Sequence, residues 1–335
     1  MRSNWVKGKS SRCGPTQQFN PTDLNTQPFI LIIYTFFNTQ DMATSSRRTA
    51  LKHMAGSAAV FTSLPSLAQR MEANDQAMGP ALKGRINHSV CRWCYDKIPL
   101  EELCKSAKAM GIQSIELTGP DEWATLKKHG LTSAMPWGAG KGIVDGFNDP
   151  KLHDELIADY EAIFPKLAAN GLNQVICFSG NRKGLSDEHG LKNCAQGLKR
   201  LMKSAEKHKV TMVMELLNSK VDHKDYQCDH TAWGAELCKA VGSENFKLLY
   251  DIYHMQIMEG DVIRNIRDNY KYISHFHTGG VPGRNEIDET QELNYPAIMK
   301  AIADLGYKGF VAQEFIPKRE DKLASLRQGV QICDV

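Results

Sequence analysis

From about residue 85 onward, short apolar runs alternate with longer amphipathic stretches. The short runs are rich in β-branched and aromatic residues and are bounded by turn residues, a pattern that predicts buried strands. These runs are Arg85–Cys91, Gln113–Leu117, Leu131–Met135, Gln174–Phe178, Val210–Glu215, Phe246–Asp251, Ile273–His277 and Gly309–Glu314. The amphipathic stretches predict helices at Leu100–Met110, Asp121–His129, Pro150–Asn170, Asp187–His208, Thr231–Val241, Val262–Tyr270 and Tyr295–Leu305.

Eight strands that alternate with helices over about 250 residues predict an α/β protein, specifically a single (β/α)8 barrel. A doubly wound open sheet is the alternative, and its nucleotide-binding form carries a glycine-rich loop after the first strand. The first predicted strand is instead followed by Arg92-Trp93-Cys94-Tyr95-Asp96, which contains no glycine. Since no repeat or linker divides residues 85–335, we expect one domain.

The N-terminal segment has the pattern of an export signal. Residues 42–68 combine the pair Arg47-Arg48, a weakly apolar small-residue stretch and the sequence Ser66-Leu67-Ala68. A basic head, an apolar middle and a small-residue cleavage site predict a signal of the twin-arginine type and export to the periplasm. An amphipathic first helix is the alternative. We interpret residues 1–41 as a disordered extension upstream of the true start at Met42, and residues 69–84 as a lead-in to the barrel.

Charge is distributed unevenly along the 335 residues, whose formal net charge is +3. Residues 1–68 contain seven basic and two acidic residues (+5), which leaves 34 basic against 36 acidic residues (−2) in the remainder. A weakly acidic body argues against binding to nucleic acid. The apolar run at residues 29–37 is too short for the ~20 residues of a membrane span. Most of the nine cysteines lie in strand or helix patterns, so we expect buried thiols.

Polar residues end the last four predicted strands: Glu215, Asp251, His277 and Glu314. The carboxyl ends of barrel strands meet at one mouth, where the active sites of this fold are built. Three carboxylates gathered there would repel one another unless a cation neutralised them. The sequence therefore predicts one divalent metal ion, and the mixed oxygen and nitrogen ligands suit Mn²⁺, Mg²⁺, Co²⁺ or Zn²⁺.

The C-terminal 120 residues resemble the hydroxypyruvate isomerase family, within the xylose isomerase-like TIM barrel superfamily. The segments that carry the resemblance are Tyr250–Gly260, Glu215–Asn218, Pro282–Glu286, Leu293–Tyr295 and Gly309–Lys318. The resemblance implies a metal held by Glu215, Asp251, His277 and Glu314. It also implies an isomerase that converts hydroxypyruvate to tartronate semialdehyde through an enediolate, with Glu215 and Glu314 as base and acid.

His254, Arg284 and Glu116 are the candidate substrate-binding residues, and Glu116 has the alternative role of contacting a metal ligand. Two other functions remain open. One is 3-epimerisation of a free ketose, since the ketose epimerases have a histidine ligand on the strand where this chain has His277. The other is sugar binding without catalysis. The partner we expect is a small sugar or hydroxy-carbonyl compound. A homo-oligomer remains open, and no membrane span is expected after removal of the signal.

Overall fold

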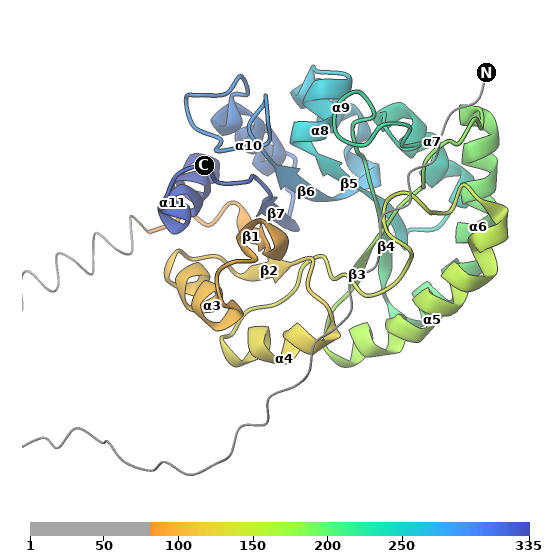
Figure 1. Ribbon diagram of the computed structural model, residues 1–335, viewed down its shortest axis with the longest axis horizontal. Helices are drawn as coiled ribbons and strands as arrows, with labels where there is room; N and C mark the ends of the chain where they lie inside the picture. The colour runs from red at the N-terminus through yellow and green to blue at the C-terminus, as the bar shows by residue number, and fades with distance from the viewer. Residues whose placement is uncertain (1–80) are drawn as a thin grey trace, which may run out of the picture. The chain divides into compact units, whose positions relative to one another are not determined.

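Seven parallel strands form one sheet in the computed structural model, which describes residues 81–335. In the order β2-β1-β7-β6-β5-β4-β3 they curve around a common centre (Figure 1). Their bounds are β1 Asn87–Cys91, β2 Ser114–Glu116, β3 Gln174–Cys177, β4 Thr211–Glu215, β5 Phe246–Asp251, β6 Ile273–Thr278 and β7 Phe310–Gln313. The architecture is therefore a TIM-barrel-like α/β fold with parallel strands.

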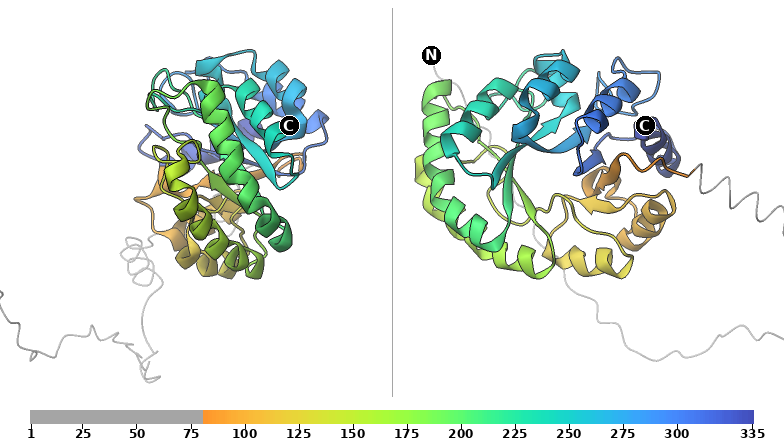
Figure 2. Two further views of the ribbon diagram at one scale, coloured as in Figure 1. Left: turned by 90° about the vertical axis from the view of Figure 1, so that its right-hand side faces the viewer. Right: turned by 180° about the vertical axis from the view of Figure 1, so that it is seen from behind.

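Helices follow the strands and surround the sheet on its outer side (Figures 1 and 2). The α-helices are α3 Leu100–Ala109, α4 Pro120–Lys128, α5 His153–Ala169, α6 Asp187–His208, α7 Thr231–Val241, α8 Ile252–Met258, α9 Val262–Asn269, α10 Tyr295–Asp304 and α11 Lys322–Cys333. Short 3-10 helices occur at η1 Arg92–Tyr95, η2 Pro150–Leu152 and η3 Tyr270–Tyr272. None of the helices within residues 81–335 is long and apolar enough to cross a membrane.

One predicted strand, Leu131–Met135, is wrong as a regular strand. The segment makes a single parallel bridge, between Thr132 and Ser114. It nevertheless bonds to β2 through Ile115 N–H to Thr132 O (3.0 Å) and toward β3 through Ile176 N–H to Pro136 O (3.3 Å). The Ala134 N–H donates to the side-chain oxygen of Ser114 (2.8 Å) and not to a backbone oxygen of β2, which explains why a regular ladder does not form here.

The core lies on both sides of the strands. In β4 and β5 nearly every side chain is buried, because one face points into the barrel and the other against the helices. Helix α6 contributes a buried apolar stripe of the amphipathic kind that its sequence predicts. All eight cysteines among the described residues are free and buried, as expected.

Two helices were not predicted from the sequence. Helix α11 packs beside β7, and α8 begins at the residue after β5 ends, with no intervening loop. Asp251 is both the last residue of β5 and the N-cap of α8. Its side chain accepts a hydrogen bond from the backbone N–H of His254 at 3.1 Å. The predictions for residues 1–41, 42–68 and 69–80 lie outside the described residues.

Candidate functional site

Four polar side chains from adjacent strands meet at the carboxyl edge of the sheet. Glu215 ends β4, Asp251 ends β5, His277 lies in β6, and Glu314 directly follows β7. The register of the parallel strands places Asp251 opposite His277. One ligand atom from each of the four buried residues lies within 4.8 Å of the others. The structure thus brings together the four predicted ligands, which we call the strand-end cluster.

Two atoms of the cluster are buried without a hydrogen bond to any described residue: Glu215 Oε1 and His277 Nδ1. They lie 3.3 Å apart, and His277 Nδ1 is 2.6 Å from Glu314 Oε2. Both atoms thus face charged neighbours at close range without a hydrogen bond of ordinary geometry, an arrangement that a shared cation would satisfy. Three carboxylates and an imidazole form an oxygen-rich donor set that fits a divalent cation.

Arg284, on the loop after β6, supplies positive charge to this cluster. Its Nη2 lies 3.0 Å from Asp251 Oδ2 and 2.5 Å from Glu314 Oε2. Its guanidinium also lies over the rings of Trp93 and Tyr253, 5.4 Å from each ring centre. Trp93 Nε1 donates to the second oxygen of Glu314 at 2.8 Å. Arg284 and Trp93 together hold the Glu314 carboxylate in place.

The electrostatic environment separates the carboxylates of the cluster. Burial raises the pKa of Glu215, and burial raises the pKa of Asp251 to about 7 despite the nearby charge of Arg284. Burial opposes ionisation of Glu314 as well, but the positive charges of Arg284 and His277 hold its pKa well below the usual range. Three carboxylates therefore share too little positive charge for all of them to ionise easily.

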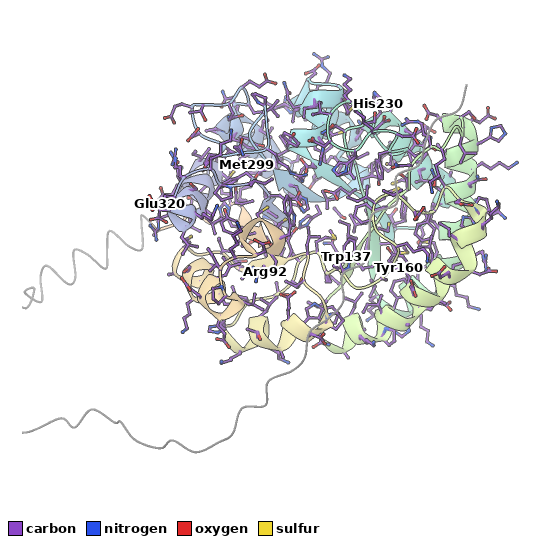
Figure 3. The ribbon with its side chains drawn as sticks, in the orientation of Figure 1. Arg92, Trp137, Tyr160, His230, Met299 and Glu320 are labelled. Carbon is purple, nitrogen blue, oxygen red and sulfur yellow. The ribbon has the colours of Figure 1, made fainter. Side chains whose placement is uncertain are left out.

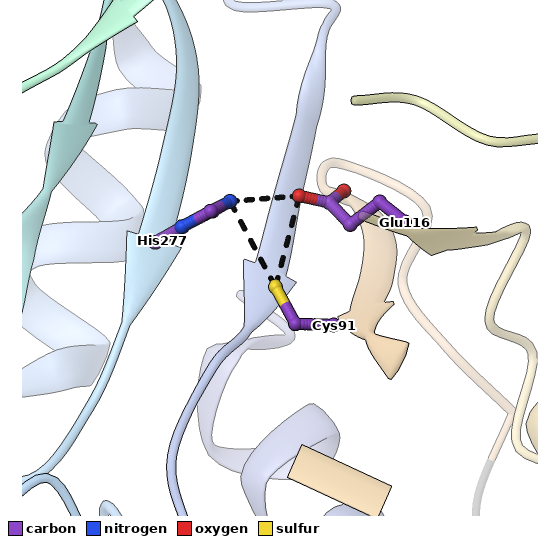
Figure 4. A group of neighbouring side chains, drawn as sticks. All are labelled: Cys91, Glu116 and His277. Atoms are coloured by element: carbon purple, nitrogen blue, oxygen red, sulfur yellow. Dashed lines mark hydrogen bonds and ion pairs between the residues drawn. The ribbon is translucent and has the colours of Figure 1, made fainter. Parts of the chain in front are cut away.

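Glu116 lies behind His277 and does not line the cavity described below. Its Oε1 is 2.7 Å from His277 Nε2 and 2.8 Å from His275 Nε2, and the carboxylate is fully buried. The Cys91 thiol completes the group, with Sγ 3.9 Å from Glu116 Oε1 and 3.8 Å from His277 Nε2 (Figure 4). Burial by itself would raise the pKa of Glu116, but the two histidines outweigh this effect and lower the pKa to about 2. An ionised Glu116 orients the ring whose other nitrogen faces the cluster.

His254 is fully buried on α8, beside the cluster. Its Nε2 is 3.7 Å from Asp251 Oδ2, and its Nδ1 is 2.6 Å from the side-chain nitrogen of Asn218. Asn218 also accepts the backbone N–H groups of Val221 and Asp222, and so it orients the loop after β4. His254 is thus in position to support Asp251, while the predicted contact with substrate stays a prediction.

A cavity of about 480 Å³ opens onto the cluster. Its polar lining consists of Glu215, Glu314, Arg284 and His223. Its apolar walls are formed by Trp93, Leu117, Trp137, Ile176, Phe178 and Leu217, and Trp137 is labelled in Figure 3. Sequence reasoning did not identify His223 as a cavity residue, because it does not directly follow a strand and shows no spacing with another candidate ligand.

Comparisons with known proteins bear on the family and the fold of this chain. Residues 104–333 match the xylose isomerase-like TIM barrel family. A 2-oxo-tetronate isomerase from Cupriavidus necator is 38% identical over 109 residues, which are 32% of this chain and 41% of that protein. The chain therefore spans less than half the length of this relative. Hydroxypyruvate isomerase from Escherichia coli K12 is 29% identical over 227 residues, 64% of this chain and 86% of that protein.

Among solved structures, an AP endonuclease of family 2 from Brucella melitensis has a TM-score of 0.66 at 24% identity. The match covers 74% of this chain and 98% of that one, and it supports the fold alone. The expected resemblance to hydroxypyruvate isomerases is confirmed, and the named relatives support an isomerase. Since the family match spans more than half of the sequence, the chain belongs to the xylose isomerase-like TIM barrel family.

Proposed function

We propose that the protein is a metal-dependent isomerase that interconverts an α-hydroxy aldehyde and an α-hydroxy ketone, as hydroxypyruvate isomerase does. The observation that carries the proposal is the strand-end cluster opening onto a cavity of substrate size. Isomerisation of this kind removes a proton next to a carbonyl group and returns it to the neighbouring carbon. It requires a base, an acid and stabilisation of the negative oxygen that develops between the two steps.

Glu215, Asp251, His277 and Glu314 would hold one divalent cation, with Mn²⁺, Mg²⁺, Co²⁺ and Zn²⁺ as the candidates. Such an ion supplies positive charge that stabilises the developing negative oxygen of the substrate. Glu215 Oε1 and His277 Nδ1 support this assignment, because both atoms are buried, face the other ligands and form no hydrogen bond of ordinary geometry with a described residue.

Glu215 and Glu314 are the proposed proton-transfer residues, because both carboxylates line the cavity. They come from β4 and β7, which are separated in the sheet by β5 and β6, and so they approach the cavity from different strands. One carboxylate takes the proton and the other returns a proton to the adjacent carbon. Arg284 keeps Glu314 in place through an ion pair and also lines the cavity.

The test is proton exchange in heavy water, followed by NMR. Protein loaded with Mn²⁺ is incubated with hydroxypyruvate and with a panel of neutral ketoses. Deuterium at the neighbouring carbon of an isomerised product supports the proposal. Deuterium at the original carbon with inverted configuration identifies a 3-epimerase instead. Absence of exchange from every compound would mean that the barrel only binds its ligand.

We also propose export to the periplasm by the twin-arginine route, on the basis of residues 42–68. A reporter fused behind these residues should reach the periplasm of a bacterial host. Replacing Arg47 and Arg48 by lysine keeps the charge and should prevent export. Export that persists in this variant would argue for a signal of another type.

A further inference from the structure

The exposed large apolar side chains lie in loops that follow the strands. Among the described residues they are Trp93, Trp137, Val144, Val221 and Ile316. Each lies in a segment that leaves the carboxyl end of a strand: after β1, after residues 131–135, after β4 or after β7. These segments border the barrel mouth. We call the five residues the apolar rim.

Two members of the rim also line the cavity. Trp93 is 41% exposed and Trp137 is 38% exposed, and both face the space onto which Glu215 and Glu314 open. The volume of about 480 Å³ falls within the roughly 300–1,000 Å³ of pockets that hold drug-sized ligands. A three-carbon keto acid bound at the strand-end cluster would fill only a small part of this volume.

The charges around the cavity do not favour an acidic substrate. Arg284 is the one lysine or arginine among the described residues that line it. Its guanidinium is already paired with Asp251 and Glu314. The carboxylates of Glu215 and Glu314 face the same space, so a substrate carboxylate would have no free counter-charge on the protein.

We propose that the natural substrate is a neutral ketose that carries a second sugar ring, and that this ring packs on Trp137 and Trp93. The proposal rests on the proposed function, because the hydroxy-ketone end must reach Glu215 and Glu314. The C–H face of a sugar ring is weakly positive and suits the negative face of an indole. The hydroxyl groups of the ring would point out of the open mouth and keep their contacts with water.

The experiment compares fructose with isomaltulose, which is fructose bearing a glucosyl ring on its O6. Both are added to the Mn²⁺-loaded full chain, with hydroxypyruvate alongside, and proton exchange and binding are followed by NMR. We expect kcat/KM for isomaltulose to exceed that for fructose by about tenfold, as one stacked ring would give. Hydroxypyruvate should be the poorest substrate of the three.

Variants of Trp137 locate the effect. Trp137→Ala should raise the KM for isomaltulose about tenfold and leave fructose within about twofold, while Trp137→Phe keeps most of the affinity. The matched control is Trp233→Ala, because Trp233 lies on α7, where its indole donates to the Asp187 carbonyl oxygen and does not line the cavity.

Several outcomes separate this inference from the proposed function. Isomaltulose that binds in a Trp137-dependent way without any proton exchange supports the inference and refutes the proposed function. Faster exchange from hydroxypyruvate than from isomaltulose refutes the inference and supports the proposed function. A dimer that Trp137→Ala dissociates, combined with no sugar binding, assigns the apolar rim to a second copy and also refutes the inference.

Discussion

Replacing Glu116 should weaken metal binding although Glu116 is not one of the proposed ligands. Its Oε1 accepts hydrogen bonds from Nε2 of both His275 and His277. The bond to His277 holds its ring so that Nδ1 faces Glu215 and Glu314, as a metal ligand would. Removing the carboxylate frees the ring to rotate or to adopt the other tautomer.

The size of the effect follows from the two contacts. Partners that orient a ligating histidine typically contribute ~10–100-fold to metal affinity, which corresponds to ~1.4–2.8 kcal/mol. Glu116→Gln keeps an acceptor oxygen but loses the charge that strengthens both bonds, so we expect a loss near ~10-fold. Glu116→Ala removes the acceptor altogether, and we expect a loss near ~100-fold.

The assay is calorimetric titration of metal-free protein with Mn²⁺ and Co²⁺. The Co²⁺ absorption spectrum reports separately on the geometry of the ligands. Denaturant unfolding of each variant checks that the fold persists, since Glu116→Ala leaves two buried donors unpaired. Glu236→Gln is the control, because Glu236 is exposed and pairs with Lys239 on the surface of α7. Metal affinity within twofold of the parent in a folded Glu116→Ala variant would refute the role assigned to Glu116.

Three further predictions concern catalysis and stability. Glu215→Gln and Glu314→Gln should each lower kcat by ~10²–10⁴-fold with an unchanged circular dichroism spectrum, and normal turnover would contradict their assignment. Burial by itself would raise the pKa of Asp229. Hydrogen bonds from His230, Arg182 and Ser219 outweigh this effect and lower the pKa from 3.8 to about 2. Asp229→Asn should therefore reduce the free energy of unfolding by ~2 kcal/mol at pH 7. That difference should persist above pH 4 and shrink toward pH 2, because a lowered pKa stabilises only while the carboxylate is ionised; urea titrations at each pH test this. Gly146→Ala should destabilise by ~1–3 kcal/mol in thermal unfolding, since its Cβ would lie 2.4 Å from Gly180 N, whereas Gly119→Ala, with open space around it, should cost less.

The charge balance of the buried carboxylates links the fold to the chemistry of the site. A buried group of three carboxylates is unstable without compensating charge, and this chain supplies Arg284 and His277 from β6 and the loop that follows it. The same constraint leaves the cavity short of free positive charge. The substrate is therefore expected to be held by stacking and hydrogen bonds more than by ion pairing, which is why the apolar rim matters for specificity.

The sequence alone was sufficient to predict all seven strands, seven of the nine α-helices among the described residues, and the strand-end cluster. Hydrophobic periodicity is a local property, and each buried strand ends where a polar residue follows its apolar run, as at Glu215 and Asp251. Once the strands are parallel neighbours, their polar ends must meet at one edge. The segment Leu131–Met135 does not form a regular strand, because the Ala134 N–H donates to the Ser114 side chain and not to the backbone of β2.

Tertiary structure decided what surrounds the cluster. Glu116 was expected to contact either the substrate or a metal ligand, and it lies behind His277 because β1 and β7 bring β2 close to β6. Trp137 and His223 reach the cavity through loops whose paths are set by packing and not by periodicity. Arg284 turns onto the carboxylates with a left-handed backbone, at φ +59°. Local pattern fixes where a strand ends, but contacts between loops remote in sequence arise only when the whole chain has packed.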